Sequence, residues 1–226
     1  MVSTLSRPAR ARSAAEKSQR RDDILRAAER LWTGSSYTDL SMNHVAREAK
    51  LAKGTLYLYF DTKEELFLAL VSVHLQTWIA DTVSLLQERQ PRSASAVADV
   101  LLDASADVAP LRRLLVLLGT VLERNVRPEL TREFRRELRA GVHTLVASLP
   151  FSEVTGLRIL RHLYALGLGW QQLTEELHPS GRAGTYSGGD RVDAEAVPEP
   201  FAPEFELAMR AIIDRLAAEE PQGTQA

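Results

Sequence analysis

The sequence predicts an all-α fold, and three observations lead to this prediction. Apolar residues recur at the i, i+3, i+4, i+7 spacing of one helix face along most of the chain, and no segment alternates as a half-buried strand does. Proline, glycine and hydroxyl residues stand where such helices would begin and end. Of the 226 residues 45% are hydrophobic, enough to bury a sizeable core. We expect about nine helices, divided between a small N-terminal domain and a C-terminal helical bundle.

The first 16 residues lack any periodicity. Three arginines, Arg7, Arg10 and Arg12, lie among alanines and serines, so we predict a disordered basic arm over residues 1–16. A helical pattern begins at Lys17 and ends at Gly34, which we expect to adopt the left-handed conformation of a C-cap. Its apolar face consists of Ile24, Ala27, Ala28 and Leu31.

Two short helices joined by a tight turn come next. Ser41 can cap the first of them, and residues 50–52, Lys-Leu-Ala, form the turn. The second short helix covers residues 53–60 and would bury Leu56 on its inner side. This order predicts a helix-turn-helix domain over residues 17–66, a motif whose second helix enters the major groove of DNA.

Side chains that can bind DNA are concentrated in and around the second short helix. The ammonium groups of Lys53 and Lys63 can neutralise phosphates, and the hydroxyls of Thr55 and the tyrosines can donate hydrogen bonds to phosphate oxygens. A glycine allows the backbone to approach DNA closely. The predicted DNA-binding residues are Ser41, Asn43, Lys53, Gly54, Thr55, Tyr57, Tyr59 and Lys63.

The distribution of charge supports this assignment. The net charge of the whole chain is −2, but residues 1–63 carry twelve Lys and Arg against seven Asp and Glu. The N-terminal part is therefore basic and the remainder is acidic. One basic end is the pattern expected when only that end meets phosphates.

The rest of the chain reads as helices interrupted by proline and glycine. Thr62 and Glu65 match a capping box that starts a long apolar helix from Leu66 to about Leu86. Further helices are predicted near residues 94–107, 110–125, 128–148, 152–178 and 203–219. Residues 179–200 contain three prolines and four glycines among polar residues, which predicts a long flexible loop.

Residues about 20–67 resemble the DNA-binding domain of the TetR family of transcriptional regulators. The most specific match is the run KGTLYLYF at residues 53–60 followed by KEEL at 63–66, and VAREA at 45–49 also matches. The sequence departs from the family pattern at three positions: Lys50 replaces a glycine of the turn, Ala52 replaces a serine or threonine, and Asp61 replaces a proline. We therefore predict that Lys50 holds a positive φ, which strains the backbone.

The resemblance implies how such a protein works. Residues 67–220 would form a helical domain that binds a small molecule and dimerises, and the homodimer would bind a near-palindromic operator in double-stranded DNA. The resemblance also implies a repressor that an unknown small-molecule effector releases from the operator. A ligand-independent regulator or an activator, and a helical interaction scaffold that does not bind DNA, are the alternatives.

Candidate residues for the two C-terminal roles come from the helical pattern. The family usually dimerises through its last two long helices, and the apolar and small residues there form a stripe that could also be intrachain core. The predicted dimer interface comprises Gly156, Leu160, Leu163, Gly167, Phe205, Met209, Ile212 and Leu216. The predicted ligand-binding residues, polar or aromatic, are Trp78, Glu123, Asn125, Phe134, His143, His162, Tyr164 and Trp170.

The sequence does not indicate a metalloprotein, an enzyme, a membrane protein or a secreted protein. The chain has no cysteine, and its five histidines are far apart, so we predict neither a metal site nor a cofactor. No catalytic constellation is recognisable. We find no stretch of about 18 apolar residues that would cross a membrane, and no secretory signal. The expected location is therefore the cytoplasm.

Overall fold

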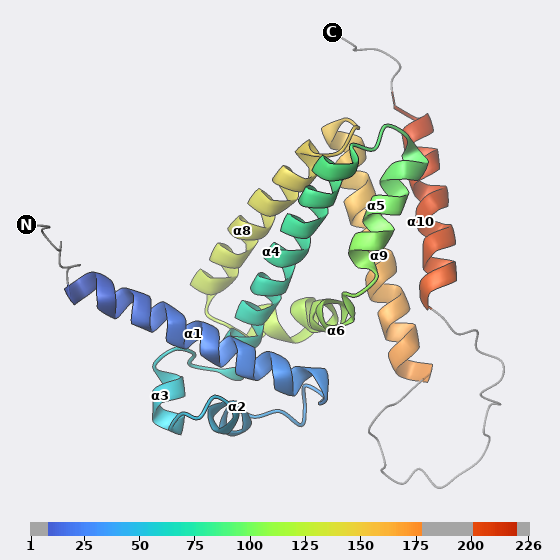
Figure 1. The fold of residues 1–226 in the computed structure, drawn as a ribbon. Helices are drawn as coiled ribbons and strands as arrows, with labels where there is room; N and C mark the ends of the chain where they lie inside the picture. Colours follow the sequence, from blue (N-terminus) through green and yellow to red (C-terminus); the bar gives the residue numbers. More distant parts are fainter. Residues whose placement is uncertain (1–8, 178–200, 221–226) are drawn as a thin grey trace, which may run out of the picture.

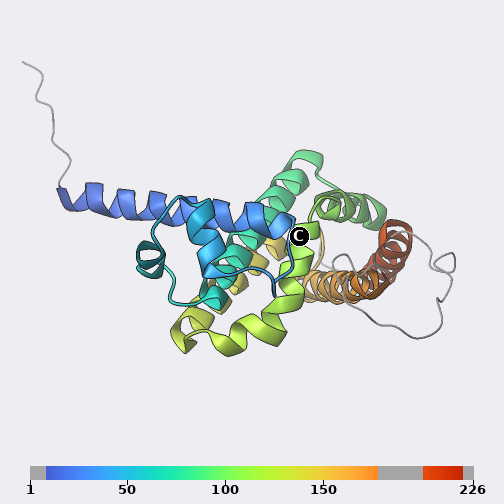
Figure 2. The same ribbon diagram turned by 90° about the horizontal axis from the view of Figure 1, so that it is seen from below.

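The computed structural model describes residues 9–177 and 201–220. Within these ranges all regular secondary structure is helical (Figures 1 and 2), which confirms the all-α prediction. Figure 1 shows an N-terminal group of three helices at one end of a bundle of longer helices. The helices are α1 (Ala9–Thr33), α2 (Met42–Glu48), α3 (Lys53–Tyr57), α4 (Lys63–Arg89), α5 (Ala94–Ser105), α6 (Ala109–Leu117), the π-helical turn η1 (Leu118–Leu122), α7 (Glu123–Asn125), α8 (Pro128–Ala147), α9 (Glu153–Leu177) and α10 (Phe201–Ala218).

Several predicted features of the helices need correction. The second short helix ends at Tyr57 and not at residue 60. Helix α1 begins at Ala9, so residues 9–16 are helical and not a disordered arm; alanine and arginine are good helix formers. Gly34 follows α1 as predicted, but its φ lies outside the left-handed region. The single helix predicted over residues 110–125 is divided by the π-helical turn η1. Residues 1–8 and the predicted loop 179–200 lie outside the described residues.

The N-terminal domain packs α1, α2 and α3 around the start of α4. Ile24 of α1 and Leu56 of α3 are completely buried. Phe67 of α4 lies at the centre, with the rings of Trp32 and Tyr37 edge-on to it at centroid distances of 5.4 and 5.0 Å. Such aromatic contacts add to the stabilisation that burial alone provides.

Helix α4 connects this domain to the helical bundle. It contains an 18-residue window with a mean hydropathy of 1.4, so the prediction that no stretch is long and apolar enough to cross a membrane is wrong. Part of this apolar surface is buried: 44% of the window lies inside the fold, where α4 packs against α5, α6 and α8. The second core combines α4, α5, α8, α9 and α10, and Leu101, Ile159 and Met209 are among its most deeply buried residues.

The start of α4 has the predicted cap, with one difference. The Thr62 hydroxyl accepts a hydrogen bond of 3.1 Å from the Glu65 N–H. The Glu65 carboxylate reaches back one residue further than expected and accepts from the Asp61 N–H at 3.1 Å. The local sequence therefore fixes the direction in which α4 leaves the N-terminal domain.

Lys50 holds the positive φ that the departure from glycine predicts, with a value of 56°. Lys50→Gly should leave the melting temperature unchanged or raise it by a few degrees. Relief of about 1 kcal/mol of strain is partly offset by the larger conformational entropy of glycine in the unfolded chain. Thermal unfolding followed by circular dichroism measures the effect, and Gln90→Gly, at the other positive φ (42°), is the matched comparison. A clear fall in melting temperature for Lys50→Gly would show that the Lys50 side chain stabilises the turn.

Candidate nucleic-acid interface and ligand cavity

The outward surface of α2 and α3 is formed as the sequence predicts. Ser41 caps α2 by accepting a hydrogen bond from the His44 N–H at 3.3 Å. Leu56 and Phe60 anchor α3 in the core, so the opposite side of this short helix faces outward. Asn43, Lys53 and Gly54 are exposed, Ser41, Thr55 and Tyr59 are half-buried, and the Tyr57 side chain is 39% exposed. Figure 1 shows α2 and α3 side by side on the outer side of this domain. Five of the predicted DNA-binding residues belong to α3 or directly follow it, Ser41 and Asn43 belong to the start of α2, and Lys63 belongs to the start of α4.

Sequence reasoning missed Leu58, which immediately follows α3. This side chain is 76% exposed, more than any other large apolar residue in the described part of the chain. Because the Leu58 side chain is exposed, it contributes little to the hydrophobic core of its own domain. It is suited to apolar contact with a thymine methyl group in the major groove. The sequence feature that points to Leu58 is its position within the KGTLYLYF run of residues 53–60.

Lys63 has a structural role that the sequence did not reveal. Its ammonium group donates hydrogen bonds to the backbone carbonyls of Tyr37 (2.8 Å) and Leu40 (3.0 Å) and lies 3.7 Å from the centre of the Tyr37 ring. Desolvation lowers the pKa of Lys63, although Glu64 beside it acts in the opposite direction. An ammonium has three N–H donors, so contact with a phosphate stays a prediction, and the residue also ties the loop before α2 to α4.

Tyr57→Ala should weaken DNA binding about tenfold or more with little change in melting temperature. A hydrogen bond to a charged group contributes about 1.5–3 kcal/mol, and an exposed ring contributes little to the core. Fluorescence anisotropy with labelled DNA from the region upstream of the gene measures the affinity. Tyr57→Phe removes only the hydroxyl and should account for most of the loss. Unchanged affinity of both variants would remove Tyr57 from the interface.

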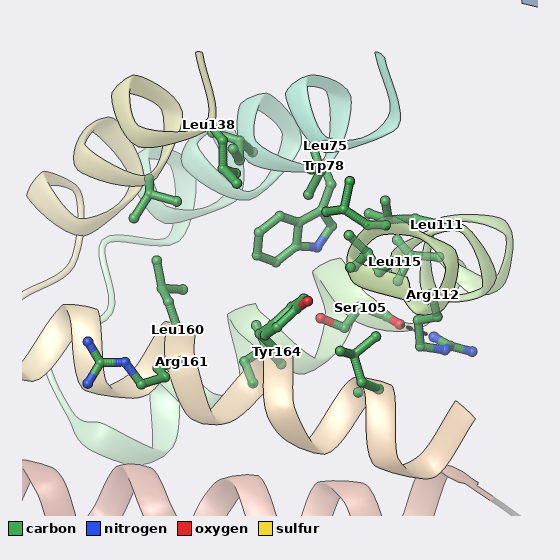
Figure 3. Close-up of a pocket in the computed structure, with 18 of the residues that line it drawn as sticks. Leu75, Trp78, Ser105, Leu111, Arg112, Leu115, Leu138, Leu160, Arg161 and Tyr164 are labelled. Carbon is green, nitrogen blue, oxygen red and sulfur yellow. Dashed lines mark hydrogen bonds between the residues drawn. The ribbon is translucent and has the colours of Figure 1, made fainter. Parts of the chain in front are cut away.

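A cavity of about 520 Å³ lies in the helical bundle between α4, α5, α6, α8 and α9 (Figure 3). Leucine is the most frequent residue in its walls, and Trp78 of α4 and Tyr164 of α9 lie on opposite sides of the space (Figure 3). Trp78, Glu123, Phe134 and Tyr164 line it, as predicted for ligand-binding residues. Sequence reasoning missed Ser105, Arg112 and Arg161, because nothing in the linear pattern shows that they meet there.

Four of the predicted ligand-binding residues do not line this cavity. Asn125 donates a hydrogen bond of 2.7 Å to the Val121 carbonyl, and His143 and His162 are exposed on the surface. Trp170 is partly buried against the second core. The polarity or aromaticity of a residue does not specify the face of a helix on which it lies.

The predicted dimer interface is largely intrachain core. Gly156, Leu163, Phe205, Met209 and Leu216 are buried within the single chain. Leu160 and Gly167 line the cavity, and Ile212 packs partly against the second core. The five buried residues are therefore not available to a partner subunit, and the predicted assignment is wrong for them. Leu160, Gly167 and Ile212 are half-buried, and their part in a dimer interface stays a prediction.

A different surface of α9 and α10 remains exposed. Val154 of α9 is 67% exposed and Leu207 of α10 is 64% exposed. Ala165 and Ala211 are exposed on the same two helices. Small residues allow close approach of another helix, and exposed large apolar side chains on adjacent helices are typical of an interaction surface.

Two polar contacts connect the cavity region to the N-terminal domain. The first comes from Arg113 of α6, whose guanidinium donates to the carbonyls of Trp32 (3.2 Å) and Ser35 (2.9 Å) at the end of α1 and lies 4.1 Å from the centre of the Trp32 ring. In the reverse direction the Trp32 indole donates to the Pro110 carbonyl at 3.3 Å. The end of α1 is thus held directly on α6.

The second contact joins α4 to the segment before α8. Arg127 donates to both oxygens of the Glu65 carboxylate, at 2.7 and 3.1 Å. Glu65 is buried and also accepts from the Asp61 N–H. The hydrogen bonds and charge of Glu65 raise the pKa of Arg127, so the guanidinium stays charged. Arg127 lies a few residues after the cavity-lining Glu123. The segment between α7 and α8 is therefore tied to the N-terminal cap of α4.

A short pair of helices with an exposed polar second helix, set on a helical bundle, defines a helix-turn-helix protein with a separate C-terminal domain. The model "Bacterial regulatory proteins, tetR family" matches residues 24–70, and the model "Tetracyclin repressor-like, C-terminal domain" matches residues 72–176. The chain belongs to the TetR family of bacterial regulatory proteins.

Similar proteins support the family assignment. An uncharacterized HTH-type transcriptional regulator of Mycobacterium tuberculosis, MT1294, is 37% identical over 102 residues, which are 45% of this chain and 41% of that protein. A second, from the lacX 3' region of Lactococcus lactis, is 38% identical over 58 residues, 26% of this chain and 30% of that protein. The alignments thus span less than half the length of these curated relatives.

Solved structures show the same fold. The multidrug binding protein EbrR complexed with imidazole is 21% identical with a TM-score of 0.59, and the match covers 91% of this chain and 97% of that one. Thermus thermophilus FadR, a TetR-family transcriptional repressor in complex with lauroyl-CoA, is 20% identical with a TM-score of 0.55, covering 91% and 98%.

Proposed function

We propose that this protein is a ligand-responsive DNA-binding transcriptional regulator that represses genes by occupying an operator. The observation that carries this proposal is the exposed side of α3, where Lys53, Tyr57 and Leu58 project from a short helix that Leu56 anchors in the core. Phosphate-binding and base-contacting groups on one such helix are what major-groove recognition requires. Such a regulator would act in the cytoplasm, where bacterial DNA lies.

The cavity supports a response to a small molecule. A volume of about 520 Å³ with mostly apolar walls is in the range of ordinary ligand pockets. EbrR and FadR are described with molecules bound, imidazole and lauroyl-CoA. A ligand-independent regulator would have no use for a cavity of this size, so we favour ligand control over the alternatives.

The structure offers a physical route from the cavity to DNA. Arg112 and Leu115 of α6 line the cavity, while Arg113 between them holds the end of α1. A ligand that moves α6 would therefore change the orientation of the N-terminal domain. The ligand shifts the population of DNA-binding conformers by its differential affinity for the two states.

The proposed regulator needs two linked DNA-binding domains. We infer that two chains form a homodimer through the outer faces of α9 and α10, which include Val154, Ala165, Leu207 and Ala211. A two-fold dimer presents two copies of α3 to a near-palindromic operator, whose half-sites lie about one helical turn, ~34 Å, or more apart.

An electrophoretic mobility shift with the DNA upstream of the gene tests DNA binding, with unrelated DNA of the same length as competitor. Retention of the specific complex in a hundredfold excess of competitor is the expected result. A promoter–reporter fusion in the presence and absence of the protein then tests repression, which should lower expression. Failure to bind any upstream or neighbouring promoter DNA would contradict the proposal, and increased expression would make the protein an activator.

A further inference from the structure

The polar groups of the cavity indicate the chemical class of its ligand. Three of them are uncharged side-chain donors: the Trp78 indole N–H, the Ser105 hydroxyl and the Tyr164 hydroxyl. Figure 3 shows these three side chains reaching the central space from α4, α5 and α9. None of the three donors has a hydrogen-bond partner among the described residues.

The three donors set a requirement for the ligand. Ser105 is only 8% exposed, so water reaches its hydroxyl mainly through the cavity. Desolvation and the nearby Glu123 carboxylate raise the pKa of Tyr164, which keeps its hydroxyl protonated. The indole N–H can only donate, and therefore a ligand that satisfies all three groups must bring an acceptor oxygen.

The charged residues of the cavity favour an anion. Among the described residues that line it, Glu123 is the one acidic residue, and both of its oxygens accept from Arg135, at 3.0 and 2.9 Å. This pair is close to neutral. The guanidiniums of Arg112 and Arg161 lie at opposite ends of the cavity (Figure 3), and Arg112 has an interaction of its own. A cationic ligand would meet the like charge of Arg161, and the Glu123 carboxylate is already paired.

The leucines of the cavity wall can contact the hydrocarbon part of a ligand. Leu75, Leu115, Leu138 and Leu160 come from four different helices and surround the space between the two arginines. Burial of hydrocarbon against such a wall contributes about 25 cal/mol per Å². An elongated hydrocarbon body with one oxygen-bearing end would contact both the leucines and the donors.

We propose that the cavity binds an apolar carboxylate: a hydrocarbon body packed against the leucines, with its carboxylate accepting hydrogen bonds from Trp78, Ser105 and Tyr164. This assignment rests on the proposed function, because it names the effector class of the same regulator. Cationic amphiphiles are excluded by the same groups.

Three probes with the same twelve-carbon chain test the assignment by isothermal titration calorimetry, below their micelle concentrations. Dodecanoate should bind most tightly. Methyl dodecanoate keeps the acceptor oxygens but not the charge and should bind roughly tenfold more weakly, since charge-assisted hydrogen bonds are about twice as strong as neutral ones. Dodecylammonium should bind roughly a hundredfold more weakly or not at all, because it cannot accept and meets like charges.

Two variants test the donors. Ser105→Ala and Tyr164→Phe should each weaken dodecanoate binding about three- to tenfold, the contribution of one hydrogen bond. Ser148→Ala is the matched control, because its hydroxyl donates to the Thr144 carbonyl at 3.0 Å and does not line the cavity. Circular dichroism and the melting temperature verify that each variant is folded.

The outcomes separate this assignment from the proposed function. Equal or tighter binding of dodecylammonium, no binding of any probe, or unchanged dodecanoate affinity in both folded variants would overturn the carboxylate assignment. Specific DNA binding by the same preparation would then leave the regulator intact. Binding of dodecanoate by a protein that binds no DNA would uphold the ligand and refute the regulator.

Discussion

Replacing Arg113 with alanine should lower the stability of the protein by about 2–4 kcal/mol. The guanidinium makes two hydrogen bonds to carbonyls at the end of α1 and packs on the Trp32 ring. A hydrogen bond from a charged donor contributes about 1.5–3 kcal/mol, and water can replace part of what is lost at a half-buried position. For a chain of this length the melting temperature should fall by roughly 5–15 °C.

The same substitution should uncouple the two domains. Arg113 is the residue of α6 that holds α1, whereas its neighbours Arg112 and Leu115 line the cavity. Without Arg113, a ligand that moves α6 has less effect on the N-terminal domain. The affinity of the variant for DNA should therefore respond less to a cavity ligand than that of the wild type, as measured by anisotropy.

Matched variants make this prediction specific. Arg113→Lys keeps a charge near Trp32 but lacks the planar fork that reaches two carbonyls, so its melting temperature should be intermediate. Arg136→Ala removes an exposed arginine of α8 that pairs only with Glu133 three residues earlier, and exposed pairs of this kind contribute little. A loss for Arg113→Ala no larger than that for Arg136→Ala would contradict the structural role.

The helix-turn-helix was predictable from the sequence because its determinants are local. The Ser41 and Thr62 caps depend on residues three positions apart, and the positive φ of Lys50 follows from the turn that the family pattern places there. The burial of Leu56 follows from its position on a short amphipathic helix. The structure confirms each of these.

The cavity was only partly predictable, since its wall is assembled from helices that are spread along the chain from α4 to α10. Arg112 and Arg113 illustrate the difficulty: they are adjacent, yet one lines the cavity and the other holds α1. Helical periodicity separates such neighbours by about 100° but does not state what each direction faces. That information comes only from the packing of α6 between α4 and α9.

The prediction of the dimer-interface residues was wrong for the buried ones, for a related reason. Helix α9 has apolar residues on more than one side: Leu163 faces the core, Leu160 the cavity and Val154 solvent. A stripe of apolar residues in the sequence identifies a buried face without showing whether the chain itself or a partner covers it. In α9 and α10 most of the regular apolar stripe is covered by the core of the chain itself.

The dimer interface proposed on the outer faces of α9 and α10 leads to the prediction with the largest expected effect on DNA binding. Leu207→Glu combined with Ala211→Glu should convert the proposed dimer to a monomer. Both positions are exposed on α10, and an isologous interface places each new charge in it twice. Burial of unpaired carboxylates costs several kcal/mol, a large part of the association energy of a typical dimer.

The single chain should tolerate both changes. Glutamates at these exposed positions are hydrated in the single chain. Phe205 and Met209, the buried residues of the same turns, are untouched. Helicity and melting temperature of the isolated chain should therefore be retained, which allows loss of assembly to be distinguished from unfolding.

Light scattering should give the mass of one chain for the double variant and of two chains for the wild type. Affinity for the operator should fall about a hundredfold or more, because a monomer loses the effective concentration that links its second DNA-binding domain. Val73→Glu alters an exposed apolar residue of α4, outside the proposed interface, and should remain dimeric. A double variant that stays dimeric with native helicity would show that the outer face of α10 is not the interface; the second DNA-binding domain would then have to be joined through another surface.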